Sequence, residues 1–143
     1  DTIASQDGMM ASLRTHFGEE TTPLLYEKVG GDFSRVTFSM FVDAAYAGDS
    51  GAAEIIRNAQ EIFANAITFS IQLLDVQQIV FYGSMFENHH FFDSLQKMLV
   101  KKIDGNYKEN FYKVVPSDMN LDLRAAPILV VSSFFGEGGH RNY

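Results

Sequence analysis

The chain has 143 residues, of which 46% are hydrophobic, a content that fits one globular domain with a single core. Eighteen acidic residues against eleven basic ones give a formal net charge of −7, which argues against a surface that binds nucleic-acid phosphates. The sequence has no cysteine, which excludes disulfides, thiolate zinc sites and a cysteine nucleophile; it favours a reducing compartment, so we expect a cytoplasmic protein.

No stretch approaches the roughly eighteen consecutive apolar residues of a membrane-spanning helix. The first residues also lack the basic and apolar regions of a signal peptide, so we expect neither a membrane nor export. Because the chain begins at Asp1 and runs directly into helix-like sequence, we expect it to be a piece of a longer protein.

The first third of the chain predicts short helices. Apolar residues at helical spacing predict a helix over Ile3–Phe17, which Gly18 ends. Residues 19–33 predict a connection with one helical turn around Leu24–Lys28, and Val36–Ala47 predicts another short apolar helix.

The strongest pattern in the sequence is a long helix over Ser50–Asp75. Gly48 breaks the preceding helix, and either Asp49 or Ser50 can cap the amides of the next one. Phe69 and Leu73 lie off the main apolar stripe, so we expect the second half of this helix to be buried on more than one side. These features predict a central helix.

The remaining sequence predicts alternating strands and helices. A strand is expected at Gln78–Tyr82, a helix at Phe91–Ile103, a second strand at Phe111–Val115 and a last helix over roughly Leu123–Phe135. This order indicates an α/β fold in which the long helix packs on a small mixed sheet. We expect residues 1–143 to form a single domain, with residues 136–143 as a mobile tail.

Two places could carry chemistry on residue types alone. His89 and His90 follow Glu87 and could hold a metal or move a proton, but adjacent histidines usually diverge, which favours a solvated helix start. Ser84 follows Gly83 at the carboxyl end of a strand, where α/β sheets place ligands, although the motif is neither a P-loop nor a dinucleotide fingerprint.

Acidic residues and nucleophiles give no stronger signal. Asp43 and Asp49 lie six residues apart across a glycine break, so capping and solvation are the expected roles. No pair of a nucleophile and a base stands out, and we predict no catalytic residue and no metal site.

Four strings carry a resemblance when they are taken in order. Read together, Asp1–Ser5, Ala47–Ala52, Leu73–Gly83 and Leu123–Leu129 resemble the carboxyl-terminal half of the ROK family, and the likeness covers nearly the whole chain to Phe135. That family joins sugar-responsive repressors, other open reading frames and sugar kinases. The resemblance implies one lobe of an actin-like, RNase H-like ATPase fold.

The resemblance also implies site residues. It places Asp1 where the family has a sugar-contacting glutamate, and it places Gly83 and Ser84 at the nucleotide loop. The family has two or three consecutive glycines there, and we expect the Met85 side chain to crowd phosphates at this loop. The catalytic loop of the family's kinases would precede Asp1, so we expect no cofactor in this chain.

The resulting hypothesis is a sugar-sensing and dimerisation domain of a ROK-type transcriptional regulator, whose DNA-binding part lies outside this chain. The expected partners are a sugar effector and, through the upstream part, DNA. The alternative is the carboxyl-terminal lobe of a ROK sugar kinase. We expect a homodimer because the chain has many large apolar side chains for the core of one small lobe. These residues are Phe33, Phe38, Met40, Phe41, Tyr46, Phe81, Phe86, Phe91 and Phe92.

Overall fold

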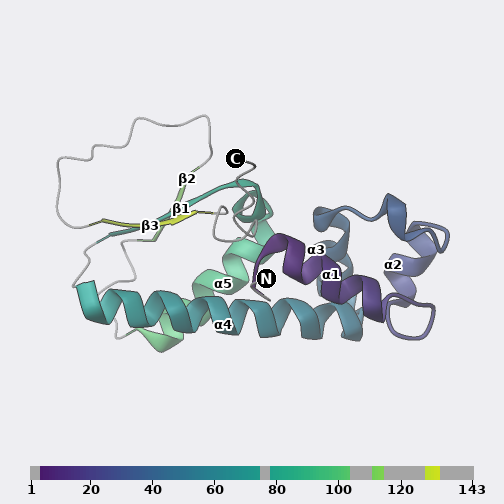
Figure 1. The fold of residues 1–143 in the computed structure, drawn as a ribbon, viewed down its shortest axis with the longest axis horizontal. Helices are drawn as coiled ribbons and strands as arrows, with labels where there is room; N and C mark the ends of the chain where they lie inside the picture. Colours follow the sequence, from purple (N-terminus) through teal and green to yellow (C-terminus); the bar gives the residue numbers. More distant parts are fainter. Residues whose placement is uncertain (1–3, 75–77, 104–110, 115–127, 133–143) are drawn as a thin grey trace, which may run out of the picture.

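The computed structural model describes residues 4–74, 78–103, 111–114 and 128–132 (Figure 1). Its elements follow one another as α1 (Gln6–His16), α2 (Pro23–Lys28), η1 (Phe33–Arg35), α3 (Phe38–Ala47), α4 (Ser50–Leu74), β1 (Gln78–Tyr82), η2 (Ser84–Glu87), α5 (His89–Lys102), β2 (Phe111–Val114) and β3 (Ile128–Ser132). The two η elements are single 3₁₀ turns.

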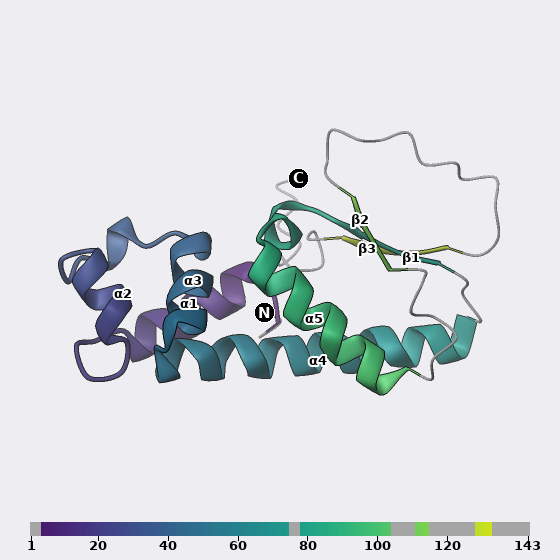
Figure 2. The same ribbon diagram turned by 180° about the vertical axis from the view of Figure 1, so that it is seen from behind.

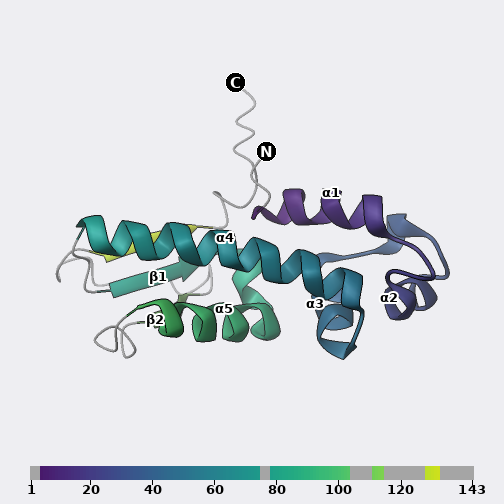
Figure 3. The same ribbon diagram turned by 90° about the horizontal axis from the view of Figure 1, so that it is seen from below.

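The long helix α4 runs along the whole described structure and joins its two halves (Figures 1 and 3). Helices α1, α2 and α3 gather around the first half of α4, and the sheet lies beside its second half. Helix α5 crosses the second half of α4 (Figure 2). The side-chain Nε2 of Gln60, which is buried on α4, donates to the carbonyl oxygen of Phe91 on α5 at 3.0 Å and so ties the two helices together.

The three described strands form a parallel sheet with the order β2-β1-β3. Val80 at the centre of β1 pairs with Tyr112 on one side and with Val130 on the other. Since Ile79, Val80 and Phe81 are all buried, β1 is a near-continuous apolar run, as expected of the central strand of a parallel sheet.

Two expectations for this half of the chain were wrong. The sheet is not mixed, because every pairing among the described strands is parallel. Residues 128–132, assigned to a last helix, form the strand β3. Their sequence, Ile-Leu-Val-Val-Ser, is a short apolar run rich in β-branched residues, and such runs favour a buried strand over a helix.

Most of the other expected elements are confirmed within a few residues. The helix predicted over Ser50–Asp75 is α4, the strand predicted at Gln78–Tyr82 is β1, and the strand predicted at Phe111–Val115 is β2. The predicted helical turn at Leu24–Lys28 is α2, which begins one residue earlier at Pro23.

The expectation that the second half of α4 is buried on more than one side was wrong. Phe69 is 63% exposed and Leu73 is 67% exposed. The sheet and α5 cover only one side of this part of α4, where Ile67 and Ile71 are buried (Figure 3). Most of the large apolar residues from which a dimer was expected pack into the core of this chain. Phe41, Phe81, Phe86, Phe91 and Phe92 are buried, Phe33, Phe38 and Met40 are partly buried, and Tyr46 is 45% exposed.

A buried carboxylate joins three helices in the other half. Asp49, in the turn between α3 and α4, has no exposed surface. Its Oδ1 accepts a hydrogen bond from the Leu24 amide at 2.9 Å, and its Oδ2 accepts one from the Leu25 amide at 2.8 Å. These amides open α2, where Thr22, the residue at the N-cap, forms no side-chain cap. Asp49 therefore caps α2 from a position more than twenty residues away.

The backbone of Asp49 completes the junction. Its amide donates to the carbonyl oxygen of Ala44 at the end of α3, and its carbonyl accepts from the Ala53 amide at the start of α4. A second contact lies beside it, where the Gly51 amide donates to the Thr21 carbonyl oxygen at 3.2 Å. A Cβ at Gly51 would stand 2.6 Å from that oxygen, so the close approach requires glycine.

We predict that Asp49→Ala lowers the free energy of unfolding by about 2–5 kcal/mol, because it leaves the buried Leu25 amide and the partly buried Leu24 amide without acceptors. Asp49→Asn keeps one acceptor and should lose less. Urea denaturation followed by circular dichroism measures both. The matched control is Asp93→Ala, which removes an exposed carboxylate from α5 and should change stability by no more than about 0.5 kcal/mol. Equal stability of the Asp49→Ala and Asp93→Ala variants would contradict the capping role.

Candidate functional site

The candidate site lies where β1 ends. Gly83 follows the strand with φ 121° and ψ 166°, a backbone conformation that favours glycine. The single turn η2 then leads into α5, and the amide of Phe86 donates to the carbonyl oxygen of Gly83 at 3.1 Å. In open α/β sheets this carboxyl edge is where ligands bind.

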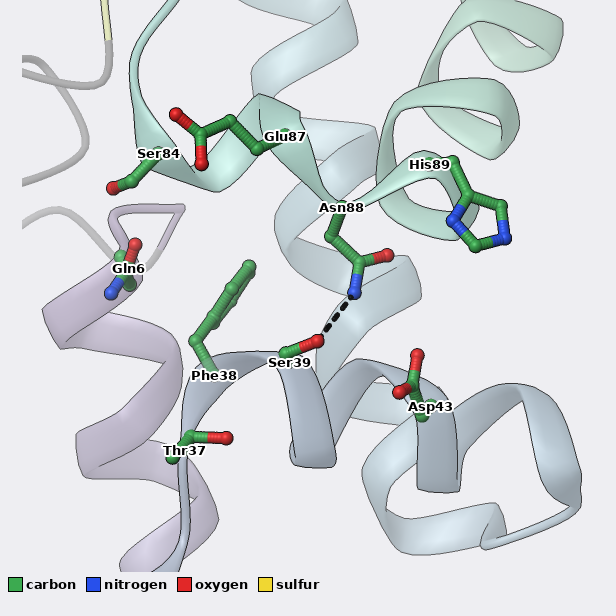
Figure 4. Close-up of a pocket in the computed structure, with 9 residues that line it drawn as sticks. All are labelled: Gln6, Thr37, Phe38, Ser39, Asp43, Ser84, Glu87, Asn88 and His89. Atoms are coloured by element: carbon green, nitrogen blue, oxygen red, sulfur yellow. Dashed lines mark hydrogen bonds between the residues drawn. The ribbon is translucent and has the colours of Figure 1, made fainter.

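A cavity of about 440 Å³ opens at this edge (Figure 4). It lies between the start of α1, the start of α3 and the segment that joins β1 to α5. Its lining residues are Gln6, Thr37, Phe38, Ser39, Asp43, Ser84, Glu87, Asn88 and His89. The volume falls within the range of roughly 300–1,000 Å³ of small-molecule sites.

Hydrogen bonds fix one wall of the cavity. The Asn88 side chain caps α5, since its Oδ1 accepts from the Phe91 amide at 3.1 Å. Its Nδ2 donates across to the Ser39 hydroxyl oxygen on α3 at 3.2 Å (Figure 4). Thr37 caps α3 in turn, accepting from the Met40 amide at 3.2 Å. The side chains that form this wall therefore also hold the two helix starts in place.

Most of the lining residues that the structure describes are polar, and none of them is a lysine or an arginine. Two carboxylates, Asp43 and Glu87, lie on it together with the imidazole of His89. Amide and hydroxyl groups supply most of the rest, and Phe38 adds one aromatic ring. Such a lining favours ligands that donate hydrogen bonds over anionic ligands.

The structure brings one of the two expected nucleotide-loop residues into the cavity. Ser84 lines it, and Gly83 immediately precedes Ser84. The expected crowding by Met85 was wrong, because that side chain is fully buried in the core. Asp1, the expected sugar-contacting residue, lies outside the described residues.

The two histidines open α5 and are exposed, as expected of a solvated helix start. Their rings do not diverge, since the centroids lie 4.1 Å apart. His89 lines the cavity, whereas His90 stacks on Tyr46 of α3 at 5.2 Å with an interplanar angle of 15°. Within the described ranges, no group of three or more histidine or acidic side chains could hold a metal ion.

Sequence reasoning missed most of the cavity. Gln6, Thr37, Ser39 and Asn88 come from three separate segments, and only the fold brings them together. Thr37 and Asn88 did carry a local signal, since a threonine or asparagine directly before an apolar helical pattern is a typical N-cap. Caps mark helix starts, and here two capped helix starts face the same cavity.

A comparison with known protein families identifies the family of this chain. Residues 1–124 match the ROK family. The chain belongs to the ROK family. Membership implies the actin-like ATPase fold, and the parallel strands with a helical crossover between β1 and β2 are compatible with it. Searches of curated proteins and of solved structures found no match. Among the described residues of this ROK protein, no helix is long and apolar enough to span a membrane.

We predict that Asn88→Ala destabilises the fold by about 1 kcal/mol, the usual cost of losing an N-cap. The contact with Ser39 between α5 and α3 is lost as well. Thermal unfolding measures the effect. Asn65→Ala is the matched control, because Asn65 is exposed in the middle of α4 and alanine favours a helix interior. A loss in Asn65→Ala as large as that in Asn88→Ala would contradict the assignment of a cap.

Proposed function

We propose that this chain is the sugar-sensing and dimerisation domain of a ROK-type transcriptional regulator that acts in the cytoplasm, with the DNA-binding part elsewhere in the parent protein. The observation that carries the proposal is the lining of the cavity beside Gly83 and Ser84. Its described residues include two carboxylates and no cationic side chain, at the place where the family's kinases bind a nucleotide.

The chemistry of phosphoryl transfer supports this choice. A kinase must neutralise the charge of a triphosphate with cationic groups or metal ions, and it must position a base. Without a metal ion between them, Asp43 and Glu87 would repel the phosphates of a nucleotide in this cavity. The Phe86 amide already donates to the Gly83 carbonyl oxygen, so it is not available to bind a phosphate. A sensor needs only to bind its ligand, and these residues are compatible with that.

Helix α4 supports the dimerisation part of the proposal. Ile62, Phe69 and Leu73 are between 44% and 67% exposed. Their spacing of seven and then four residues places them on one face of the helix, with the small Ala66 between them. No charged residue occurs from Ile62 to Leu74. We propose that a second copy of the chain covers this face, in a two-fold arrangement that pairs the α4 helices.

We predict no phosphoryl transfer by this chain. Incubation with magnesium ATP and a panel of hexoses should yield no sugar phosphate above the buffer blank, as followed by chromatography. In the parent protein, the effector sugar should change the affinity for operator DNA in a mobility-shift assay. Formation of a sugar phosphate would favour the kinase lobe instead, and a parent protein that binds no DNA would contradict the regulator.

We predict that Leu73→Glu converts the dimer to a monomer, because it places a charge in the apolar face of α4. Gln72→Glu adds the same charge at the neighbouring exposed position outside that face, so it should leave the dimer intact. Light scattering over a concentration series measures the mass of each. A wild-type chain that stays monomeric at high concentration would contradict the α4 interface, as would a dimer that survives Leu73→Glu.

A further inference from the structure

We propose that the cavity at the carboxyl end of β1 binds a neutral polyhydroxylated ligand of monosaccharide size, held through the Gln6 amide oxygen and the Asp43 carboxylate. This inference rests on the proposed sensing function and adds a site to it. The site lies beside the family's nucleotide loop and does not involve Asp1.

One end of the cavity holds a hydrogen-bond acceptor that has no donor. The Oε1 atom of Gln6 is buried, and among the described residues it accepts no hydrogen bond. A buried acceptor without a partner costs about 1–3 kcal/mol, and native structures contain few of them. Figure 4 shows Gln6 at one end of the cavity, facing Ser84. A hydroxyl group of a bound ligand would supply the missing donor.

The opposite end of the cavity holds a second hydrogen-bond acceptor. Asp43 lies on α3, across the cavity from Gln6 (Figure 4). Its side chain is exposed and forms no ion pair with a described lysine or arginine. An ionised carboxylate accepts through two oxygens and can bind two neighbouring hydroxyl groups at once. The two acceptor ends therefore match a ligand that carries donors along its length.

The middle of the cavity offers a hydrogen-bond donor and an aromatic ring to such a ligand. The Ser39 hydroxyl oxygen accepts from Asn88, which leaves its own proton free to donate to a ligand oxygen. Phe38 lies between Gln6 and Ser39 in Figure 4. Its ring is partly buried in edge contacts with Phe41 and Phe91, at centroid distances of 6.2 and 5.7 Å. A partly exposed ring suits the apolar C–H face of a sugar, whereas its hydroxyl groups reach the polar ends.

The electrostatics select against the alternative ligand. A nucleotide or sugar phosphate would bring negative charge to a cavity whose described lining includes Asp43 and Glu87 and neither lysine nor arginine. A neutral sugar avoids that repulsion and uses the Asp43 carboxylate as an acceptor. The volume of about 440 Å³ leaves room for one monosaccharide and a few waters.

The test is a titration of the ¹⁵N-labelled chain with D-glucose, D-galactose, D-mannose, D-fructose and N-acetyl-D-glucosamine, monitored by amide chemical shifts. At least one sugar should give saturable shifts centred on Gln6, Ser84 and Asn88, including the Gln6 side-chain amide. Magnesium ATP should give none at these positions. Gln6→Ala and Asp43→Asn should each weaken binding of the selected sugar about tenfold, the effect of losing one good hydrogen bond.

The control is Asp93→Asn, which makes the same charge change as Asp43→Asn at an exposed position outside the cavity and should leave the affinity unchanged. Thermal unfolding of each variant checks the fold, and Ser84→Ala replaces Gln6→Ala if the latter disturbs α1. The inference is overturned if no sugar gives saturable shifts, if the shifts centre elsewhere, or if the folded cavity variants bind like the wild-type chain.

These results also separate the site from the proposed function. If a sugar controls DNA binding by the parent protein but Gln6→Ala and Asp43→Asn leave the affinity for that sugar unchanged, the site is wrong and the function stands. If a sugar fills the cavity but leaves DNA binding unchanged, the site stands and the function is wrong.

Discussion

The described helical half of this ROK protein depends on one buried carboxylate. Asp49 accepts two backbone amides of α2, while its own backbone closes α3 and opens α4. A buried carboxylate is costly unless its oxygens are satisfied, and here two amides at a helix N-terminus satisfy them. The junction sets the direction in which α3 leaves α4. It therefore positions Thr37, Ser39 and Asp43, which form one wall of the cavity.

The other wall depends on the end of β1. Gly83 turns the chain, and η2 then sends Met85 and Phe86 into the core. The Asn88 side chain joins the two walls by capping α5 and donating to Ser39. The residues that build the walls of the cavity therefore also stabilise the fold. At its ends, the Gln6 Oε1 atom and the Asp43 carboxylate form no hydrogen bond or ion pair with the described residues. This division between fixed walls and available ends is what a binding site requires.

Sequence patterns predicted the elements better than their contacts. The boundaries of α4 and β1 followed from an uninterrupted helical period and from a compact β-branched run that ends at glycine. The helix assigned around Ile128 was wrong, because short apolar runs fit a buried helix and a buried strand equally well until the pairing with β1 is known. The exposure of Phe69 and Leu73 could not be foreseen either, since a second apolar stripe does not reveal what covers it.

The candidate site was harder to predict for the same reason. Gly83 and Ser84 were found because they end a strand. Gln6 has no sequence signal, and Asp43 was expected only to cap a helix or to be solvated; both reach the site only through tertiary packing. Either Asp49 or Ser50 was expected to cap the helix that follows. The Asp49 side chain instead caps α2, a contact across 24 residues of sequence that local patterns do not encode. The Met85 side chain was expected to crowd phosphates at the nucleotide loop. It does not, because it is buried in the core.

The central claim is that this ROK domain presents a cavity for a neutral hydroxylated ligand where the family's kinases present one for a nucleotide. The most direct measurement is a pair of crystal structures of the chain, one soaked with the sugar that it selects and one with magnesium ATP. We expect a sugar that spans the cavity from Gln6 to Asp43, and no nucleotide at Gly83 and Ser84. A nucleotide with its phosphates against Ser84, and no sugar in the cavity, would contradict it.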